Sequence, residues 1–151
     1  LLFILFTALA GSCLAASSTV NVSAVIQSKS ICKFKTKSAV LDFSGLDPVA
    51  APDVTRQTIL SFVCDGSAVQ ATYLITDDDG LNESGPNGNR MLHDSVSAVY
   101  LPYSLSLNPT SATIPKGILQ TLTVTGTVLG NDYRNALVGT YTDTVTLTIT
   151  P

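Results

Sequence analysis

The chain has 151 residues and few charges: eight lysines and arginines stand against eleven aspartates and glutamates, for a formal net charge of −3. It has no basic amphipathic stretch and no basic segment interleaved with aromatic residues, which argues against nucleic acid as a partner. This length suits one domain with a substantial core, rather than a small scaffold held by several disulfides.

Residues 1–16 have the character of a secretory signal peptide. An apolar run over residues 1–10 is too short to cross a bilayer, and small residues follow it through Ala16. We expect cleavage after Ala15 or Ala16. Since no Met and no basic segment precede the run, we also expect the leader to lack its first residues. A lipid-modified Cys13 is the alternative, but the stretch ending at Cys13 lacks the branched aliphatic residue usual at its first position.

The segment after the leader predicts a strand at the N-terminus. Apolar and polar residues alternate from Thr19 onward, and the first charged residue is Lys29. The apolar side consists of Val20, Val22, Ala24 and Ile26. Because neither charge nor proline interrupts it, the strand has nothing to prevent pairing with another chain.

Six further alternating runs predict strands in the rest of the chain. They cover residues 39–43, 58–64, 70–76, 98–107, 120–129 and 141–150. No interval between them repeats its apolar residues with the helical period, while Thr, Val and Ser are abundant, so the fold class is all-β. Together with the N-terminal run they make seven strands, which suggests an immunoglobulin-like β-sandwich.

Cys32 and Cys64 remain once the leader is removed, and an even number of cysteines in an exported chain predicts a disulfide between them. In the chain-entropy description a loop of this size is worth about 4 kcal/mol. Neither cysteine belongs to a Cys-x-x-Cys motif or lies near a histidine. We therefore expect no metal, no redox chemistry and no cofactor.

The last two runs each carry a feature that bears on pairing. In 120–129, Gly126 interrupts an otherwise apolar face, which indicates a bulge or the close approach of another side chain or backbone. In 141–150, threonines alternate with Tyr141, Asp143, Val145, Leu147 and Ile149. After Asp143 no charge or internal proline protects this strand, so it predicts an open edge.

Three polar features have both a functional and a structural interpretation. The acidic segment 77–83 invites a calcium hypothesis, but the Glu that an EF-hand requires after Gly80 is missing, which favours a solvated turn. The single histidine, His93, has no nucleophile motif to accompany it, so we expect a loop histidine and no enzyme. The lysines around Cys32 favour a solvated strand edge over a basic patch that meets the acidic segment of a neighbouring subunit. These lysines are Lys29, Lys33, Lys35 and Lys37.

Several residues together resemble a known family. In chain order they are Cys32, Leu41-Asp42-Phe43 with Asp47-Pro48, Phe62-Val63-Cys64, Asn89-Arg90-Met91, Tyr103-Ser104-Leu105 and Gly139-Thr140-Tyr141-Thr142-Asp143-Thr144-Val145. Their order and spacing are similar to those of the spore coat protein U domain, which is also the subunit fold of archaic chaperone-usher pili. The resemblance covers nearly the whole chain after the leader. Its most specific parts are the cysteine pair and the terminal Gly-x-Tyr-x-Asp-x-Val pattern.

This resemblance implies an immunoglobulin-like sandwich that lacks its last strand. In the family a periplasmic chaperone lends a strand, and at an outer-membrane usher the N-terminal extension of the next subunit replaces it. The chain is then expected to divide into a signal peptide at 1–16, a donor-strand extension at 17–28 and a pilin domain at 29–151. The expected donor residues are Val20, Val22, Ala24 and Ile26, and the expected acceptor groove is lined by Val145, Leu147 and Ile149.

The expected function is structural. The resemblance implies a pilus subunit that passes through the periplasm to the cell surface, joins neighbouring pilus subunits of the same or another kind, and supports adhesion or biofilm formation. The main alternative is a secreted coat or binding protein whose N-terminal strand completes its own sandwich. A calcium- or sugar-binding module is a third possibility that no residue pattern demands.

Overall fold

The computed structural model describes residues 19–25, 29–86 and 88–151. These residues form ten strands and one short helix, so the all-β fold class is confirmed. The strands are β1 (Ser30–Phe34), β2 (Val54–Gly66), β3 (Gln70–Asp77), β4 (Arg90–His93), β5 (Tyr100–Pro102), β6 (Ser104–Asn108), β7 (Ser111–Pro115), β8 (Gln120–Val128), β9 (Tyr141–Thr142) and β10 (Leu147–Thr150), and the helix is α1 (Gly130–Tyr133). In this part of the chain no helix is long and apolar enough to cross a bilayer.

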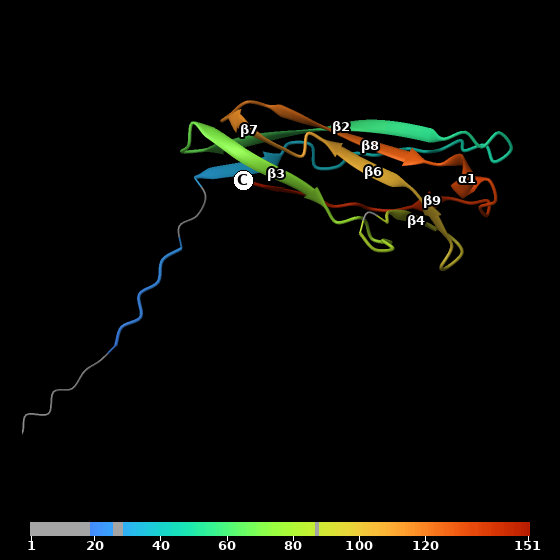
Figure 1. The fold of residues 1–151 in the computed structure, drawn as a ribbon, viewed down its shortest axis with the longest axis horizontal. Coiled ribbons are helices and arrows are strands. Elements are labelled where there is room, and N and C mark those ends of the chain that lie inside the picture. The colour runs from blue at the N-terminus through green and yellow to red at the C-terminus, as the bar shows by residue number, and fades with distance from the viewer. Residues whose placement is uncertain (1–18, 26–28, 87) are drawn as a thin grey trace, which may run out of the picture.

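The strands form three antiparallel sheets that make up an elongated sandwich (Figure 1). The first sheet has the order β1-β2-β8-β6, the second β10-β3-β7, and a small third sheet β5-β4-β9. We call residues 141–150 the terminal segment. It contributes β9 to the third sheet and β10 to the second, and residues 143–146 between them belong to no strand. This change of sheet places the end of the chain along one side of the sandwich.

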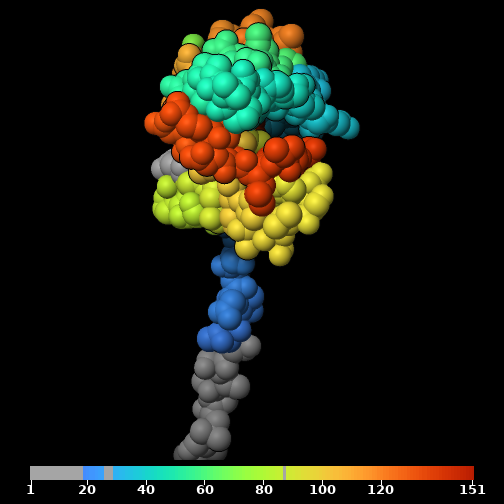
Figure 2. Space-filling model, turned by 90° about the vertical axis from the view of Figure 1, so that its right-hand side faces the viewer, coloured from blue at the N-terminus to red at the C-terminus, as the bar shows by residue number. Residues whose placement is uncertain are grey.

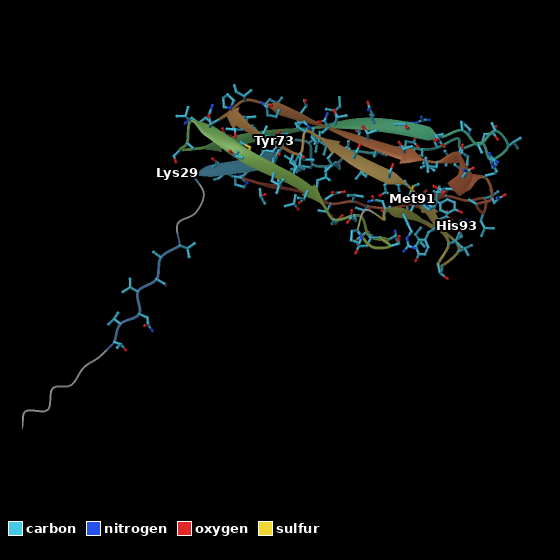
Figure 3. The ribbon with its side chains drawn as sticks, in the orientation of Figure 1. Lys29, Tyr73, Met91 and His93 are labelled. Atoms are coloured by element: carbon cyan, nitrogen blue, oxygen red, sulfur yellow. A yellow bond between two sulfur atoms is a disulfide. The ribbon has the colours of Figure 1, made fainter. Side chains whose placement is uncertain are left out.

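The main core lies between the first and second sheets, because each strand there alternates apolar and polar residues. Phe62 and Cys64 of β2 and Leu122 of β8 have no exposed surface and face the buried residues of β3. Tyr73 is one of these (Figure 3). Its ring contacts that of Phe62 edge-on at a centroid distance of 4.8 Å. The outward positions carry threonines, such as Thr55 and Thr127, whose hydroxyls are 2.9 Å apart. Apolar burial thus joins the sheets, and polar side chains cover their outer faces.

A second, smaller core lies at the α1 end of the sandwich. It contains Ala51, Leu101, Val128 and Tyr133. The Tyr133 hydroxyl donates to the carbonyl of Pro52 (2.6 Å), and Asp53 Oδ1 accepts from the amide of Gly130 (2.8 Å). These bonds fix the loop before β2 against the helix.

The predicted disulfide is confirmed. Cys32 in β1 and Cys64 in β2 are directly opposite each other in the antiparallel ladder, and their sulfurs are bonded. Cys64 is fully buried and Cys32 nearly so. The disulfide therefore attaches the edge strand β1 to the centre of the first sheet.

Several predicted strand boundaries are wrong. Among the described residues, 39–43 have no strand partner, and neither do 19–25, the described part of the predicted N-terminal strand. The run 98–107 is divided into β5 and β6, which pair with different strands, β4 and β8. β1, β4 and β7 were missed because they are short and mix polar with apolar residues, so alternation alone does not mark them.

Candidate functional site

A groove of about 630 Å³ runs along the open side of the sandwich. One wall is the chain that continues from β1, residues 36–41 with Phe43, and the other is residues 141–147 of the terminal segment. Figure 2 looks at the α1 end of the molecule and shows the hollow between these two segments, cyan above and orange-red below. The groove therefore lies between parts of the chain that are far apart in the sequence.

The floor of the groove is apolar. Leu60 of β2 and Val124 of β8 are buried at its base, and Leu105 of β6 is half-buried beside them. Phe34 of β1 lies at the groove as well and packs edge-on against Phe62, with ring centroids 6.2 Å apart. These side chains belong to the main core or pack against it, so the groove is a part of the core that reaches the surface.

Neither wall of the groove has a strand partner on the side that faces it. Among the described residues, β1 pairs only with β2 and β10 only with β3, while residues 36–43 and 143–146 pair with no strand. β1 and β10 are neighbours in space, so the two walls come together at this end. A backbone segment lying between the walls would meet an edge on each side and apolar side chains beneath.

The predicted acceptor residues do not all lie in the groove. Val145 and Leu147 line it, whereas Ile149 packs against the main core nearer the end of the chain, outside the groove lining. The sequence-based prediction missed the opposite wall, where Leu41 and Phe43 lie. The signal lies in the run 39–43, where Leu41 and Phe43 occupy alternate positions, a pattern that also predicts a paired strand.

Gly126 explains how the wall at Leu41 and Phe43 fits against β8. A Cβ atom at this position would lie 2.8 Å from Phe43 Cζ and 3.1 Å from Leu41 Cδ1. The ladder with β2 continues through Gly126 without a bulge. Of the two possibilities predicted from the sequence, close approach of other side chains is therefore the correct one.

We predict that Gly126→Val displaces Leu41 and Phe43 towards the groove. The added methyl groups meet both side chains, so overpacking should cost about 1 to 3 kcal/mol of unfolding free energy, measured by urea denaturation. Thr123→Val, on the outward face of the same strand, is the matched control and should change the stability by less than about 0.5 kcal/mol. Equal effects of the two substitutions would contradict the close contact.

Asp143 anchors the unpaired part of the terminal segment. Its Oδ2 accepts from the Tyr103 hydroxyl (2.8 Å), and its Oδ1 accepts from the amide of Leu81 (3.1 Å) and the side-chain amide of Asn82 (3.0 Å). Burial, followed by the bond to Asp143, raises the pKa of the Tyr103 hydroxyl well above its usual value, so this hydroxyl remains a donor. Gly80 is required in the facing loop, because a Cβ there would contact Asp143 Oδ2.

The acidic segment 77–83 forms hydrogen bonds with the terminal segment and is therefore not a fully solvated turn. We call this set of hydrogen bonds the acidic clasp. Asp78 Oδ1 accepts from the backbone amides of Thr146 (2.9 Å) and Gly80 (3.1 Å), and the amide of Asp78 donates to the carbonyl of Thr146 (3.2 Å). The Thr146 amide, as the largest influence, lowers the pKa of the Asp78 carboxyl. Across the described residues no group of three or more His, Cys, Asp or Glu side chains is placed to hold a metal ion.

We predict that the acidic clasp weakens in acid. The pKa of Asp78 is lower in the folded chain than in the unfolded one, so its carboxylate contributes stability above about pH 4, and that contribution is lost as the pH falls through the folded-state value. Asp78→Ala should therefore lower the Tm near neutral pH, and its difference from the unmodified chain should shrink on acidification. Glu83→Ala, with an exposed side chain, is the control and should show little difference at either pH. A pH-independent effect of Asp78→Ala would contradict the role of the charge.

The predicted donor residues lie away from the groove. Val20 and Val22 are 84% and 90% exposed, and Ala24 is also exposed. The blue segment in Figure 1 extends outward from the sandwich. Ile26 and the predicted leader lie outside the described residues.

The sequence match decides which family this chain represents. A family model described as the Spore Coat Protein U domain matches residues 16–148, which include both walls and the floor of the groove. The chain belongs to the Spore Coat Protein U domain family. The resemblance seen in the sequence is thus confirmed.

Solved structures share the fold of this Spore Coat Protein U domain. One is the CsuC-CsuE chaperone-tip adhesion subunit pre-assembly complex from archaic chaperone-usher Csu pili of Acinetobacter baumannii: 17% identity, a TM-score of 0.51, and coverage of 80% of this chain and 39% of that one. Another is a chaperone-tip adhesin complex of CFA/I fimbriae biogenesis: 14% identity, a TM-score of 0.51, and coverage of 80% and 42%. The chain thus spans about two-fifths of each. These likenesses establish the immunoglobulin-like sandwich. No curated protein sequence matches the chain.

The terminal Gly-x-Tyr-x-Asp-x-Val pattern of this Spore Coat Protein U domain has a structural reason at each position. A Cβ at Gly139 would contact the His93 ring, and the Tyr141 hydroxyl donates to the carbonyl of Leu137 (2.9 Å). Asp143 accepts a hydrogen bond from the amide of Leu81 in the acidic segment, and Val145 lines the groove. The pattern therefore positions one complete wall of the groove.

The expectation that His93 lies in a loop is wrong. Met91 and His93 both belong to β4 (Figure 3); Met91 lines the groove and His93 is buried. His93 Nδ1 accepts from the amides of Ser95 (3.1 Å) and Val96 (3.2 Å), which places the ring proton on Nε2 for donation to the carbonyl of Val138 (3.2 Å). The ring thus ties β4 to the chain just before the terminal segment.

The lysines around Cys32 do not form one patch. Lys33 and Lys35 border a shallow hollow with Ile31, Val63 and Asp65, whereas Lys37 lies at the main groove. Lys29 precedes β1 at one end of the sandwich (Figure 3). The lysines thus border different parts of the surface, which favours solvated strand edges over a single basic surface.

Proposed function

We propose that this chain is a structural pilus subunit that joins its neighbours by donor-strand exchange. One observation carries the proposal: an apolar groove lies between two chain edges without strand partners, and the same chain has an exposed extension of alternating apolar residues. In this role the extension of one subunit lies in the groove of the next and pairs with both walls. No reaction is catalysed.

The dimensions of the two parts are compatible. Side chains on one face of a strand repeat at intervals of about 6.7 Å, so Val20, Val22, Ala24 and Ile26 extend over about 20 Å. Val145 and Leu147 have the same spacing on the groove wall. Burial of the two valines and the isoleucine, together with backbone bonds, contributes on the order of 5 to 10 kcal/mol before the cost of ordering the extension.

The position of the extension favours exchange over self-completion. A coat or binding protein that completes its own sandwich would place its N-terminal strand against the terminal segment. Instead Val20, Val22 and Val25 are all exposed by more than four-fifths of their surface. The groove and the extension thus each expose apolar surface that a second copy of the chain buries.

The further partners follow from the same role. The chaperone in the similar Csu complex supports a periplasmic chaperone that covers the groove before assembly, and we extend this to an outer-membrane usher at which neighbouring subunits join. Each part of the chain then has its own task. The signal peptide at 1–16 directs export, the extension at 17–28 donates a strand, and the domain at 29–151 accepts the strand of a neighbour. The assembled fibre lies at the cell surface, where it supports adhesion or biofilm formation.

The purified full chain tests this function directly. On a denaturing gel without heating, a ladder of oligomers should appear, and heating should reduce it to the monomer, because a non-covalent strand joint survives detergent but not full unfolding. Limited proteolysis of the oligomers should leave residues 19–25 protected. A monomer with a protease-resistant extension would indicate self-completion and overturn the proposal.

A further inference from the structure

The end of the sandwich at which the extension joins the domain carries exposed apolar side chains. We call this end, formed by Lys29 and the turns 66–70 and 115–120, the Lys29 pole. Val69 is 81% exposed, and Ile118 and Leu119 are more than half exposed. The two turns are adjacent, because the Lys116 amide donates to the carbonyl of Val69 (3.2 Å).

The opposite end carries a second exposed apolar group. We call this end, formed by the loop 45–53, helix α1 and residues 134–140, the α1 pole (Figure 1). Val49 is 92% exposed, Val138 98%, and Leu137 about half. The bonds from Tyr133 to Pro52 and from Gly130 to Asp53 hold loop and helix together. Both poles thus present exposed apolar side chains on loops that hydrogen bonds hold in place.

The charges at the two poles have opposite signs. Lys29 and Lys116 lie at the Lys29 pole, with Asp65 nearby. The α1 pole carries Asp47, Asp53 and Asp132 with a single Arg134. Contact between unlike poles therefore brings basic and acidic groups together, whereas contact between like poles repeats the same charge.

The short connection between extension and domain determines which surfaces meet. Only residues 27 and 28 separate Ile26, the last donor residue, from Lys29, a reach of roughly 11 Å at most. When the extension lies in a neighbour's groove, the Lys29 pole of the donor must therefore lie against the pole of the acceptor at which the extension leaves.

The direction of the extension in the groove selects that pole. The terminal segment, which forms one wall of the groove, begins at the α1 pole and ends near the Lys29 pole (Figure 1). An extension leaving at the Lys29 pole brings two like poles together, and mutual exchange then closes a dimer. An extension leaving at the α1 pole brings unlike poles together, and the contact repeats along a fibre without closing. The extension then runs antiparallel to the terminal segment.

We propose, resting on the donor-strand function above, that the two poles form a second contact between successive copies of this chain. Val69, Ile118 and Leu119 of one copy lie against Val49, Leu137 and Val138 of the next, with Lys29 and Lys116 facing the acidic residues of the α1 pole. The strand joint connects the subunits, and the pole contact fixes the angle between them. The partner is thus a second copy of the same chain.

A cysteine pair tests this contact in oligomers of the full chain carrying Cys13→Ser, in which the remaining native cysteines, Cys32 and Cys64, are joined in the disulfide. With Ile118→Cys and Val138→Cys in one chain, a flexible bis-maleimide should convert the heat-sensitive ladder into one that resists heating, because each link joins the Lys29 pole of one copy to the α1 pole of the next. Ile118→Cys with Ser106→Cys, whose second cysteine lies on the outer face of β6, is the matched control and should remain heat-sensitive. Ile118→Cys alone should give no linked species, because the Lys29 poles of two copies do not meet.

The outcomes separate the two proposals. An unheated ladder that stays fully heat-sensitive after reaction of the 118 and 138 pair would overturn the pole contact and leave donor-strand exchange intact. Linked dimers from Ile118→Cys alone, with no longer ladder from the pair, would show that like poles meet and would also overturn it. Absence of any unheated ladder would overturn the proposed function, and the pole contact with it.

Discussion

Deletion of residues 17–26 should leave a folded domain that no longer donates a strand. The side chains of the described part of this segment are exposed, so their removal should change the unfolding free energy by less than about 0.5 kcal/mol. The shortened chain retains its groove and should bind a synthetic peptide of residues 17–28, whereas its own ladder on unheated gels should disappear. Circular dichroism melting, peptide titration and the gel measure these three properties.

A pair of neighbouring substitutions makes this test specific. Val22→Asp places a charge on the side of the extension that enters the groove, where burial of an unpaired carboxylate is costly, and should abolish the ladder. Ser23→Asp places the same charge on the opposite side of the strand and should preserve it. A domain that fails to fold after deletion of residues 17–26 would instead indicate that the extension completes its own sandwich.

Replacement of both disulfide cysteines should have the largest effect on stability. Cys32→Ala with Cys64→Ala removes the cross-link between positions 32 residues apart. Loss of a loop of this length should lower the unfolding free energy by about 4 kcal/mol in the chain-entropy description. The two buried sulfurs also leave space in the main core. Urea denaturation of the variant and the oxidised parent measures the difference.

The reduced parent protein is the control for this experiment. A reducing agent should destabilise the parent by an amount close to that of the double substitution, and should leave the variant unchanged. Because the disulfide attaches β1 to the first sheet, and Phe34 of β1 lies at the groove, the variant should also bind the extension peptide more weakly. A loss of stability below about 1 kcal/mol would show that β1 is held mainly by its ladder with β2.

The two sites of contact proposed for the fibre have different physical origins. The groove exposes apolar surface between two walls without strand partners on the sides that face it, and the proposed strand joint covers it with backbone and side chains. The poles expose apolar side chains on loops and turns, and in the proposed contact they are covered by side-chain packing rather than by strand pairing. A fibre with an intact strand joint and a disrupted pole contact should remain assembled but bend more freely.

Much of this molecule could be predicted from local patterns. Alternation with a period of two identified the strands later found at 70–77 and 120–128, because each buries one face against the facing sheet. The even number of cysteines predicted the disulfide, and Gly126 indicated either a bulge or a close approach, of which the structure shows the close approach. The order of short motifs was specific enough to predict the family.

Only the tertiary structure decided how these parts meet. Residues 39–43 and 143–146 alternate like strands, yet among the described residues they have no strand partner, because the sheets separate there to form the groove. The acidic segment 77–83 and Tyr103 hold the terminal wall through bonds to residues distant in the sequence, which no local pattern encodes. Alternation is a property of one segment, whereas an open edge depends on which segment lies beside it, and that is determined by packing of the whole chain.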